Sequence, residues 1–381
     1  MNKIKRILCL SLAIVCLLSF ASCSFIQGLL PGGQQPDASH LCAECGKCPD
    51  AECECTEKCE GHTPAHECES VCENCGKCLD AECQDAACAE KCEGHEQVEV
   101  AYGLKIMSFN LDQAYGSDTS KQSKIFDKIM EEIPDLLGVQ EETPAWEKYL
   151  TGKLAAEGYV RVGEYRATQP SHAYYGYREA SAIYYNVDRF VLVDSGTFWL
   201  SPTPEVEGSV ATGWDSSALF PRVCTWVVLK DKLSGFEFAY FNSHFSYEAA
   251  KLRNESAKLI LSRIEEAGIP AFFSGDLNFA SNEETDTYAA ITEKMEDSRI
   301  EAPETMSGNT FHNYGYAAGE SYGDGKCKTV PIDYIFATKG DFTALTFKIL
   351  SETGSKGNSA DYYSDHFAIV ATFEYTVEYT K

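Results

Sequence analysis

Residues 104–142 open with the apolar run LKIMSFNL (104–111) and close with a second such run, DLLGVQEE (135–142). Each run is short, rich in Leu, Ile, Val or Phe, and has polar side chains at or near its end, which is typical of a buried strand. Between the two runs, Ile125, Ile129 and Ile133 recur at the spacing of one helix face. This stretch therefore predicts a strand, an amphipathic helix and a second strand.

The same pattern continues toward the C-terminus. Thr143 and Pro144 are the residue types of a helix N-cap and a first helical position. The longest predicted helix covers residues 247–266 and is stopped by Gly268 and Pro270. Further strands are predicted at residues 181–185, 190–193, 224–230, 236–243, 271–274, 332–337 and 367–373. We therefore expect an α/β (α+β) domain over residues 101–381, with two stacked sheets and helices on their outer faces.

Polar side chains recur at the ends of the predicted strands. Singly, each has an ordinary explanation, because Asp and Asn cap helices and turns and a lone His is more often structural. Together they predict a site built from several strands, since the end of a packed strand holds a side chain rigidly. The residues concerned are Asn110, Glu141, His244, Asp276, Asn278, Asp333, Asp365 and His366.

Seven segments resemble, in order, the endonuclease/exonuclease/phosphatase superfamily, which includes pancreatic deoxyribonuclease, sphingomyelinases and deadenylases. They are IMSFNL, LLGVQEE, REASAIYYN, FNSHF, FSGDLN, PIDYIF and SDHFAIV, and with their flanks they span residues 104–373. One Gly-Asp-x-Asn segment alone is weak, because Asp-x-Asn occurs in many turns, whereas all seven in order are specific. The resemblance implies a four-layer DNase I-like sandwich of two mixed β-sheets flanked by helices.

The resemblance also implies a metal centre and a general base. Glu141 would be the principal metal ligand, with Asn110 and Asp365 nearby, and such hard oxygen ligands suit Mg²⁺ or Mn²⁺. His366 would act as the general base toward the attacking water. Asp333 would orient the His366 imidazole and stabilise its protonated form.

Four further residues are assigned to the phosphate by the same resemblance. Asp276 and Asn278 would position the nucleophile and bind a phosphate oxygen. His244 would hydrogen-bond the scissile phosphate or protonate the leaving group, with Glu179 as the carboxylate that keeps it charged. A Glu and His pair is typical of the deoxyribonuclease, sphingomyelinase and deadenylase branches.

The charge of the chain bears on the substrate. A formal net charge of −26 disfavours a broad nucleic-acid-binding face, because phosphate backbones are attracted by Lys and Arg. No stable nucleic-acid complex is expected, and the chain is expected to be a monomer. A phosphate ester must then be held by metal and local groups. Arg222, in PRVCTW, resembles an arginine common in deadenylase-like members and could clamp a phosphate, with a structural ion pair as the alternative. Arg178 is a weaker candidate of the same sort.

Residues 1–22 are typical of an export signal, with three basic residues followed by an apolar run that ends in Ala-Ser before Cys23. This ending resembles the bacterial lipoprotein signal, in which Cys23 becomes the lipid-modified first residue, although Phe20 stands where Leu is usual. The alternatives are plain secretion and an uncleaved anchor, for which the run is shorter than the roughly 18 apolar residues of a span. Residues 23–39 would be a flexible tether. We expect an extracellular, membrane-anchored lipoprotein of a bacterial cell.

Residues 40–95 contain thirteen of the 18 cysteines, in two repeats. The spacing Cys-x2-Cys-Gly-Lys-Cys-x4-Cys begins at Cys42 and again at Cys72, and each copy ends in Glu-Lys-Cys-Glu-Gly-His. Paired cysteines in an exported chain favour disulfides, while Cys-x2-Cys with a nearby His also fits Zn²⁺. Cys68 is left over from the repeats. Disulfides, Zn²⁺ and a redox-active or unstructured segment all stay open.

Two classes of function follow. The first is an exported, divalent-metal-dependent phosphoesterase that cleaves phosphodiester or phosphomonoester bonds by attack of an activated water. Its substrate would be nucleic acid, a nucleotide, a phospholipid head group or a phosphorylated metabolite. The second is a surface binding, metal or redox module built on the Cys-rich repeats, with an inactive enzyme-like scaffold.

Overall fold

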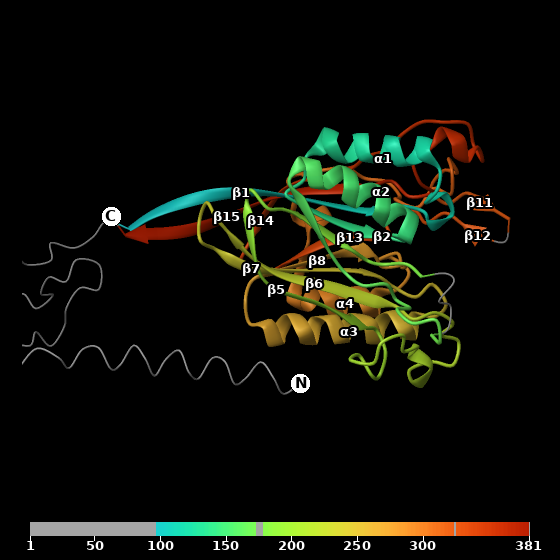
Figure 1. Cartoon of the computed structure of the whole chain (residues 1–381), viewed down its shortest axis with the longest axis horizontal. Coiled ribbons are helices and arrows are strands. Elements are labelled where there is room, and N and C mark those ends of the chain that lie inside the picture. Colours follow the sequence, from blue (N-terminus) through green and yellow to red (C-terminus); the bar gives the residue numbers. More distant parts are fainter. Residues whose placement is uncertain (1–96, 173–177, 324, 381) are drawn as a thin grey trace, which may run out of the picture. The chain divides into compact units, whose positions relative to one another are not determined.

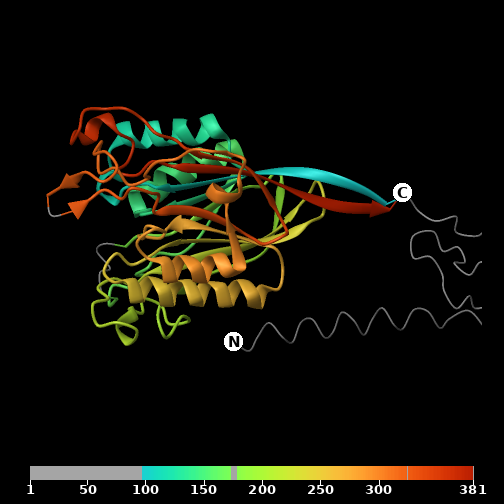
Figure 2. The same ribbon diagram turned by 180° about the vertical axis from the view of Figure 1, so that it is seen from behind.

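The computed structural model describes residues 97–172, 178–323 and 325–380. In this part of the chain two large β-sheets stack face to face, with helices on both outer faces (Figure 1). The view from behind shows the same four layers (Figure 2). The predicted fold class, a four-layer DNase I-like sandwich, is confirmed. The expected signal segment, tether and Cys-rich repeats, residues 1–95 with Cys23, lie outside the described residues.

The first sheet has seven strands in the order β10-β14-β15-β1-β2-β4-β3. Its centre is β1, which pairs parallel with β2 and antiparallel with β15. The strands are β1 (Gln97–Asn110), β2 (Leu136–Gln140), β3 (Tyr159–Val162), β4 (Ile183–Asn186), β10 (Glu304–Thr305), β14 (Thr343–Ile349) and β15 (Ile369–Thr380).

The second sheet has six strands in the order β5-β6-β7-β8-β13-β9. β7 runs parallel with β8, and β13 runs antiparallel to β8. The strands are β5 (Phe190–Trp199), β6 (Val223–Asp231), β7 (Glu237–His244), β8 (Ala271–Asp276), β9 (Met295–Asp297) and β13 (Asp333–Thr338). A separate small hairpin is formed by β11 (Ser321–Tyr322) and β12 (Gly325–Lys326).

The helices cover the two outer faces. α1 (Thr119–Glu132) and α2 (Pro144–Leu154) lie on the seven-stranded sheet, and α3 (Ala250–Ala267) and α4 (Thr285–Lys294) lie on the six-stranded one (Figure 1). α5 (Ser298–Glu301) is a single turn. The Thr143 hydroxyl caps α2 by accepting from the Trp146 amide, as the sequence predicts. Gly268 ends α3 in the left-handed conformation, with φ 63°.

Apolar side chains fill the three spaces between the four layers. Phe238, Phe272 and Phe373 belong to the cluster between the sheets. Ile129 and Trp146 belong to the cluster beneath α1 and α2, and a third cluster lies beneath α3 and α4. Each fully buried side chain of this size contributes about 1.5–3 kcal/mol. The stacking of the layers, and with it the relative position of the strand ends, is therefore strongly determined.

A buried polar network ties the two sheets together. Asn242 of β7 donates to the carbonyl oxygens of Val139 and Ala182, both at 2.9 Å, and accepts from Gln140 Nε2 at 2.8 Å. These contacts join β7 of one sheet to β2 of the other just before both strands end. A satisfied buried network of this kind fixes geometry, because any shift would leave polar groups unpaired.

Most predicted elements are confirmed, although several bounds differ. β1 begins at Gln97 instead of residue 104, and α3 begins at Ala250 instead of residue 247. β5 continues to Trp199, beyond the predicted end at residue 193, because its polar edge-strand residues still pair with β6. Among the described residues, no helix is long and apolar enough to cross a membrane.

The backbones of β7 and β8 lie very close together at Gly275. Its φ is 152°, and a Cβ there would overlap the carbonyl oxygen of Ser243. Gly275→Ala is therefore expected to lower the free energy of unfolding by roughly 3 kcal/mol or more, measured by urea denaturation. The control is Gly152→Ala in α2, where a Cβ meets nothing within 4 Å. That variant should gain up to about 1 kcal/mol, because Ala favours helix over Gly. Wild-type stability of Gly275→Ala would contradict the close approach.

Candidate active site

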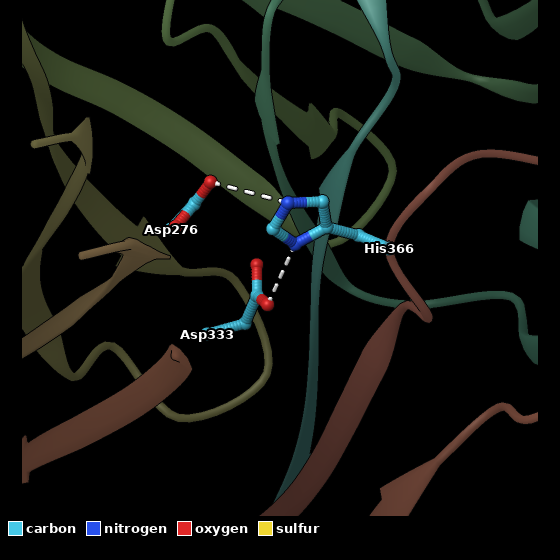
Figure 3. Close-up of side chains that lie close together, drawn as sticks. All are labelled: Asp276, Asp333 and His366. Atoms are coloured by element: carbon cyan, nitrogen blue, oxygen red, sulfur yellow. Dashed lines mark hydrogen bonds and ion pairs between the residues drawn. The ribbon is translucent and has the colours of Figure 1, made fainter. Parts of the chain in front are cut away.

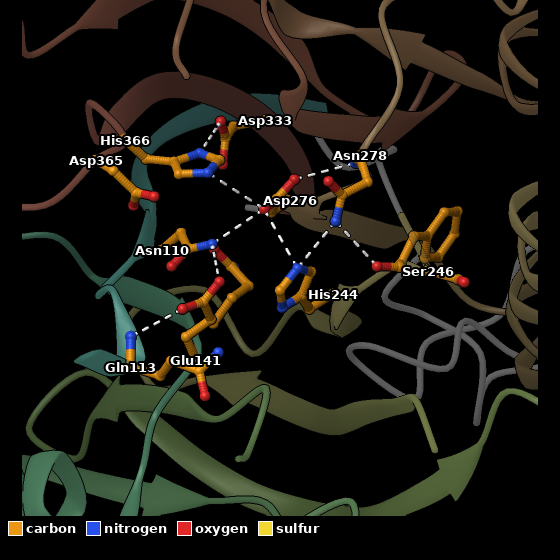
Figure 4. A network of polar contacts seen from close by, with 12 residues as sticks. Asn110, Gln113, Glu141, His244, Ser246, Asp276, Asn278, Asp333, Asp365 and His366 are labelled. Atoms are coloured by element: carbon orange, nitrogen blue, oxygen red, sulfur yellow. Dashed lines mark hydrogen bonds and ion pairs between the residues drawn. The ribbon is translucent and has the colours of Figure 1, made fainter. Parts of the chain in front are cut away.

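The predicted strand-end residues meet at one edge of the sandwich (Figure 4). Parallel pairing of β1 with β2 places the ends at Asn110 and Gln140 side by side, directly before Glu141. Parallel pairing of β7 with β8 does the same for His244 and Asp276. Asp333 opens β13 and is the register partner of Asp276. The sheet pairing therefore gathers residues that are far apart in sequence.

His366 lies between two carboxylates (Figure 3). Its Nδ1 hydrogen-bonds Asp333 Oδ2 at 2.9 Å, and its Nε2 faces Asp276 Oδ2 at 3.5 Å. Burial lowers the pKa of His366, but Asp333 and Asp276 outweigh burial and hold that pKa well above its ordinary value. The imidazole is thus oriented by Asp333 through Nδ1, with Nε2 turned toward the centre of the site.

Asp276 is the hub of the polar network (Figure 4). Its Oδ2 accepts from Asn110 Nδ2 at 3.0 Å, and its Oδ1 accepts from the Asn278 amide at 3.0 Å. Burial raises the pKa of Asp276 to about 7, with a further rise from Asp333 and an opposing effect from His366. Asn278 adopts φ 55°, an uncommon conformation for a residue with a side chain, and such strain concentrates at functional sites.

His244 lies on the other side of Asp276. Its Nε2 is 3.0 Å from Asn278 Nδ2 and 3.4 Å from Asp276 Oδ2, while its Nδ1 has no hydrogen-bond partner among the described residues. Burial lowers the pKa of His244 well below its ordinary value, and the cations of Arg222 and Arg166 lower it further. The imidazole is therefore neutral in this state.

The predicted pairing of Glu179 with His244 is wrong in this structure. Glu179 instead forms a buried ion pair with Arg166, with Nη2 to Oε1 at 2.7 Å. A backbone hydrogen bond from the Arg166 amide to the Glu179 carbonyl, at 2.8 Å, holds the two residues together. Burial raises the pKa of Glu179 to about 7 even beside this arginine. Glu179 therefore neutralises Arg166 and leaves His244 without a carboxylate on Nδ1.

The two predicted phosphate-binding arginines have different surroundings. Arg222 lines the cavity, is only 7% exposed, and has no ion pair among the described residues; its Nε also lacks a hydrogen-bond partner there. A buried, unpaired guanidinium is costly unless an anion joins it. Arg178 lies 5.3 Å from the centre of the Tyr165 ring and is not among the residues that line the cavity.

Glu141, Asn110 and Asp365 form a carboxylate-rich corner of the site (Figure 4). Glu141 Oε1 accepts from Asn110 Nδ2 at 3.0 Å and its Oε2 accepts from the Gln113 amide at 2.8 Å, while its backbone has φ 57°. Burial raises the pKa of Asp365 to about 7, and the nearby carboxylates of Asp112, Glu141 and Asp276 raise it further.

This repulsion between carboxylates is the observation that fits a divalent cation. Several acidic oxygens share a small volume in which His366 is the positively charged neighbour of Asp365. Mg²⁺ or Mn²⁺ would relieve the repulsion and prefers such oxygen ligands. The ligand atoms of Asp276, Asp333 and His366 also lie within 4.8 Å of one another. Because both nitrogens of His366 already face carboxylates, that trio suits proton transfer better than metal binding.

Most of these groups border one open cavity of about 1000 Å³. Glu141, Asp276, Asp365 and His366 lie on it together with His244 and Asn278. Arg166, Arg253 and Tyr247 also line it, although they were not among the predicted site residues. No local signal identifies these three, because each reaches the cavity through contacts between distant segments.

A carboxylate-rich corner beside an aspartate-oriented histidine, at the strand ends of a two-sheet sandwich, defines a phosphoester hydrolase site. The family model of the endonuclease/exonuclease/phosphatase family matches residues 107–366, and the chain belongs to that family.

Solved structures agree with this assignment. A mannosyl-6-phosphatase of Bacteroides thetaiotaomicron is 30% identical, with a TM-score of 0.58 over 71% of this chain and 99% of that one. A family member of Bacteroides vulgatus is 26% identical, with a TM-score of 0.61 over 72% and 99%. Another from Bacteroides thetaiotaomicron is 29% identical, with a TM-score of 0.60 over 73% and 100%. The comparison with curated proteins gave no match.

Proposed function

We propose that this protein is a divalent-metal-dependent phosphoesterase that hydrolyses phosphomonoesters of small polar metabolites. The observation that carries the proposal is the complete polar set around Asp276, with the unpaired Arg222 guanidinium in the same cavity. The 30% identical mannosyl-6-phosphatase supports a monoester substrate. The net charge of −26 weighs against a polyanionic substrate such as nucleic acid.

In the proposed reaction, Glu141, Asn110 and Asp365 would hold Mg²⁺ or Mn²⁺. When bound, such an ion supplies electrostatic stabilisation of the charge that develops on the phosphate and the leaving oxygen. His366 in its neutral form takes a proton from the attacking water through Nε2, while Asp333 holds the imidazole through Nδ1 and stabilises the charged form that results. Asp276 and Asn278 position the water.

The remaining groups hold the phosphate. Arg222 donates to non-bridging phosphate oxygens, so that its buried guanidinium is paired with an anion. His244, neutral and held by Asn278, acts as a hydrogen-bond partner of the phosphate instead of a permanent cation. The completeness of this set favours an active enzyme over a decayed scaffold that serves only the Cys-rich repeats.

We also propose export and attachment to the outer face of a bacterial membrane through lipidated Cys23, with the catalytic domain acting as a monomer. The support is the signal-like sequence of residues 1–22. A phosphatase outside the cell would release inorganic phosphate and an uncharged metabolite from extracellular esters.

Metal dependence and the monoester preference can be tested together. Protein stripped with EDTA is expected to be inactive and to regain phosphate release when Mg²⁺ or Mn²⁺ is added. A hexose 6-phosphate and glycerol 1-phosphate should be hydrolysed with a higher kcat/KM than bis-p-nitrophenyl phosphate. Phosphate is measured colorimetrically. Full activity in EDTA, or a preference for the diester, would contradict the proposal.

A further inference from the structure

An exposed aromatic ring lines the cavity next to the proposed catalytic groups. Tyr247 follows His244 closely in the chain and is 55% exposed, although most tyrosines of the two sheets are buried. The ring of Phe220, also on the cavity, lies 6.3 Å from the Tyr247 ring at an interplanar angle of 46°. Together the two rings form an aromatic wall, defined here as Phe220 and Tyr247.

The backbone beneath the aromatic wall is held firmly. The Ser246 carbonyl oxygen accepts from Arg253 Nη1 at 2.9 Å, and the Ser246 hydroxyl donates to Glu248. Glu248 in turn accepts from the Leu219 amide at 3.3 Å, which joins the segment of Tyr247 to the segment of Phe220. Arg253 is itself buried and bonded to Glu284, with Nε to Oε2 at 3.0 Å. These hydrogen bonds fix the backbone in a conformation that keeps the Tyr247 ring exposed. A ring that is already in place binds a ligand at a lower entropic cost.

Positive charge already lies against both rings. Arg222 lies 6.0 Å from the centre of the Tyr247 ring, and Arg166 lies 4.9 Å from the centre of the Phe220 ring. The Arg222 guanidinium, which has no ion pair among the described residues, disfavours a cationic head group such as choline on the Tyr247 ring, because like charges repel. The leaving group that fits is therefore not cationic, and it has an apolar face for the rings.

Charged groups border the rest of the cavity. Glu283 and Glu284 lie on it, and Lys328 donates to Glu283 Oε2 at 2.5 Å. Carboxylates paired with Arg or Lys present both donors and acceptors at fixed positions. Such a set matches several hydroxyl groups, whereas an aliphatic lipid tail would cover these charged groups without hydrogen-bonding to them.

We propose that the aromatic wall binds the leaving group as a pyranose ring, so that the substrate is a sugar phosphomonoester. The C–H face of the sugar packs on the Tyr247 ring, and its hydroxyls meet the charged border of the cavity. This inference rests on the proposed phosphoesterase function and assigns Tyr247 as the residue that determines specificity for the leaving group.

Variants of Tyr247 test the inference through relative specificity. The quantity measured is the kcat/KM for a hexose 6-phosphate divided by that for glycerol 1-phosphate, which has no ring. Tyr247→Leu keeps apolar bulk but removes the aromatic face, and should lower this ratio about tenfold, mainly through KM for the hexose phosphate. Tyr247→Phe keeps the ring and should retain the ratio within about threefold. Leu233→Ala, at an exposed residue in the turn before β7, is the control and should leave the ratio unchanged.

Four outcomes separate the possibilities. An unchanged ratio in Tyr247→Leu overturns the inference. So does a loss confined to adenosine monophosphate, which would indicate a nucleobase on the ring. If wild-type protein with Mg²⁺ or Mn²⁺ hydrolyses glycerol 1-phosphate but no hexose phosphate, the sugar inference is wrong while the proposed function stands. If it hydrolyses none of these esters, the proposed function itself is wrong.

Discussion

His366→Ala is expected to lower kcat by about 10²–10⁴-fold, since general-base catalysis contributes a factor of this size. The imidazole is the group that can remove a proton from water at the centre of the site, because its Nδ1 is fixed by Asp333 and its Nε2 points toward Asp276. The loss should appear in kcat more than in KM, measured as steady-state phosphate release with Mg²⁺. A urea midpoint close to that of wild type would show that His366→Ala keeps its fold.

Asp333→Asn provides the matched control for this role. The Asp333 carboxylate raises the pKa of His366, so its removal should lower that pKa. The base is then deprotonated at lower pH, and the acid limb of the kcat/KM profile moves to lower pH while the maximum rate falls. Turnover of His366→Ala near the wild-type rate, or an unmoved acid limb in Asp333→Asn, would show that another group accepts the proton.

The centre of the site was predictable because it follows a local rule. Asn110, His244 and Asp276 each close a short apolar run, and parallel pairing brings the ends of such runs to one edge. Asp333 lies at the same edge because it begins β13, and β13 runs antiparallel to β8. A pattern of this kind needs only strand positions and sheet order, and both are visible in the alternation of apolar runs and polar ends.

The partner of Glu179 was not predictable for the opposite reason. Isolated bridges pair Ala180 with both Glu142 and Tyr165, and this irregular pairing brings Arg166 against Glu179. No periodicity marks such a contact in the sequence. β14 was missed as well, because its sequence TALTFKI mixes polar and apolar residues and only part of it is buried. Side-chain partners that depend on irregular segments, unlike strand ends, need the tertiary structure.

In so acidic a protein, a site for phosphate needs positive charge close to where the phosphate binds. The net charge of −26 opposes the approach of any anion, so attraction must come from groups at the site itself. Arg222 supplies one buried charge that no described carboxylate pairs, while Glu179 cancels the charge of Arg166. One cation from the protein and the proposed metal ion would together match a doubly charged phosphomonoester better than a polyanionic chain.

Glu141→Gln is expected to lower kcat/KM at least about a hundredfold and to weaken metal binding, because it removes one of the two negative charges proposed as metal ligands. Two readouts besides activity are available. Mg²⁺ at about 100 times its Kd should stabilise the wild-type protein by about 2.7 kcal/mol, and most of this increment should disappear in the variant. Isothermal titration with Mg²⁺ should show the same loss of affinity.

The stability of metal-free Glu141→Gln distinguishes a metal ligand from a structural role for Glu141. Glu141 is one of the carboxylates that raise the pKa of Asp365, so neutralising it removes repulsion when no cation is bound. Metal-free Glu141→Gln should therefore be at least as stable as metal-free wild type, although it binds Mg²⁺ more weakly. Glu157→Gln, an equal change of charge outside the cavity, should alter neither quantity. If Glu141→Gln destabilises the metal-free protein and leaves the Mg²⁺ increment intact, Glu141 has a structural role and the cation binds elsewhere.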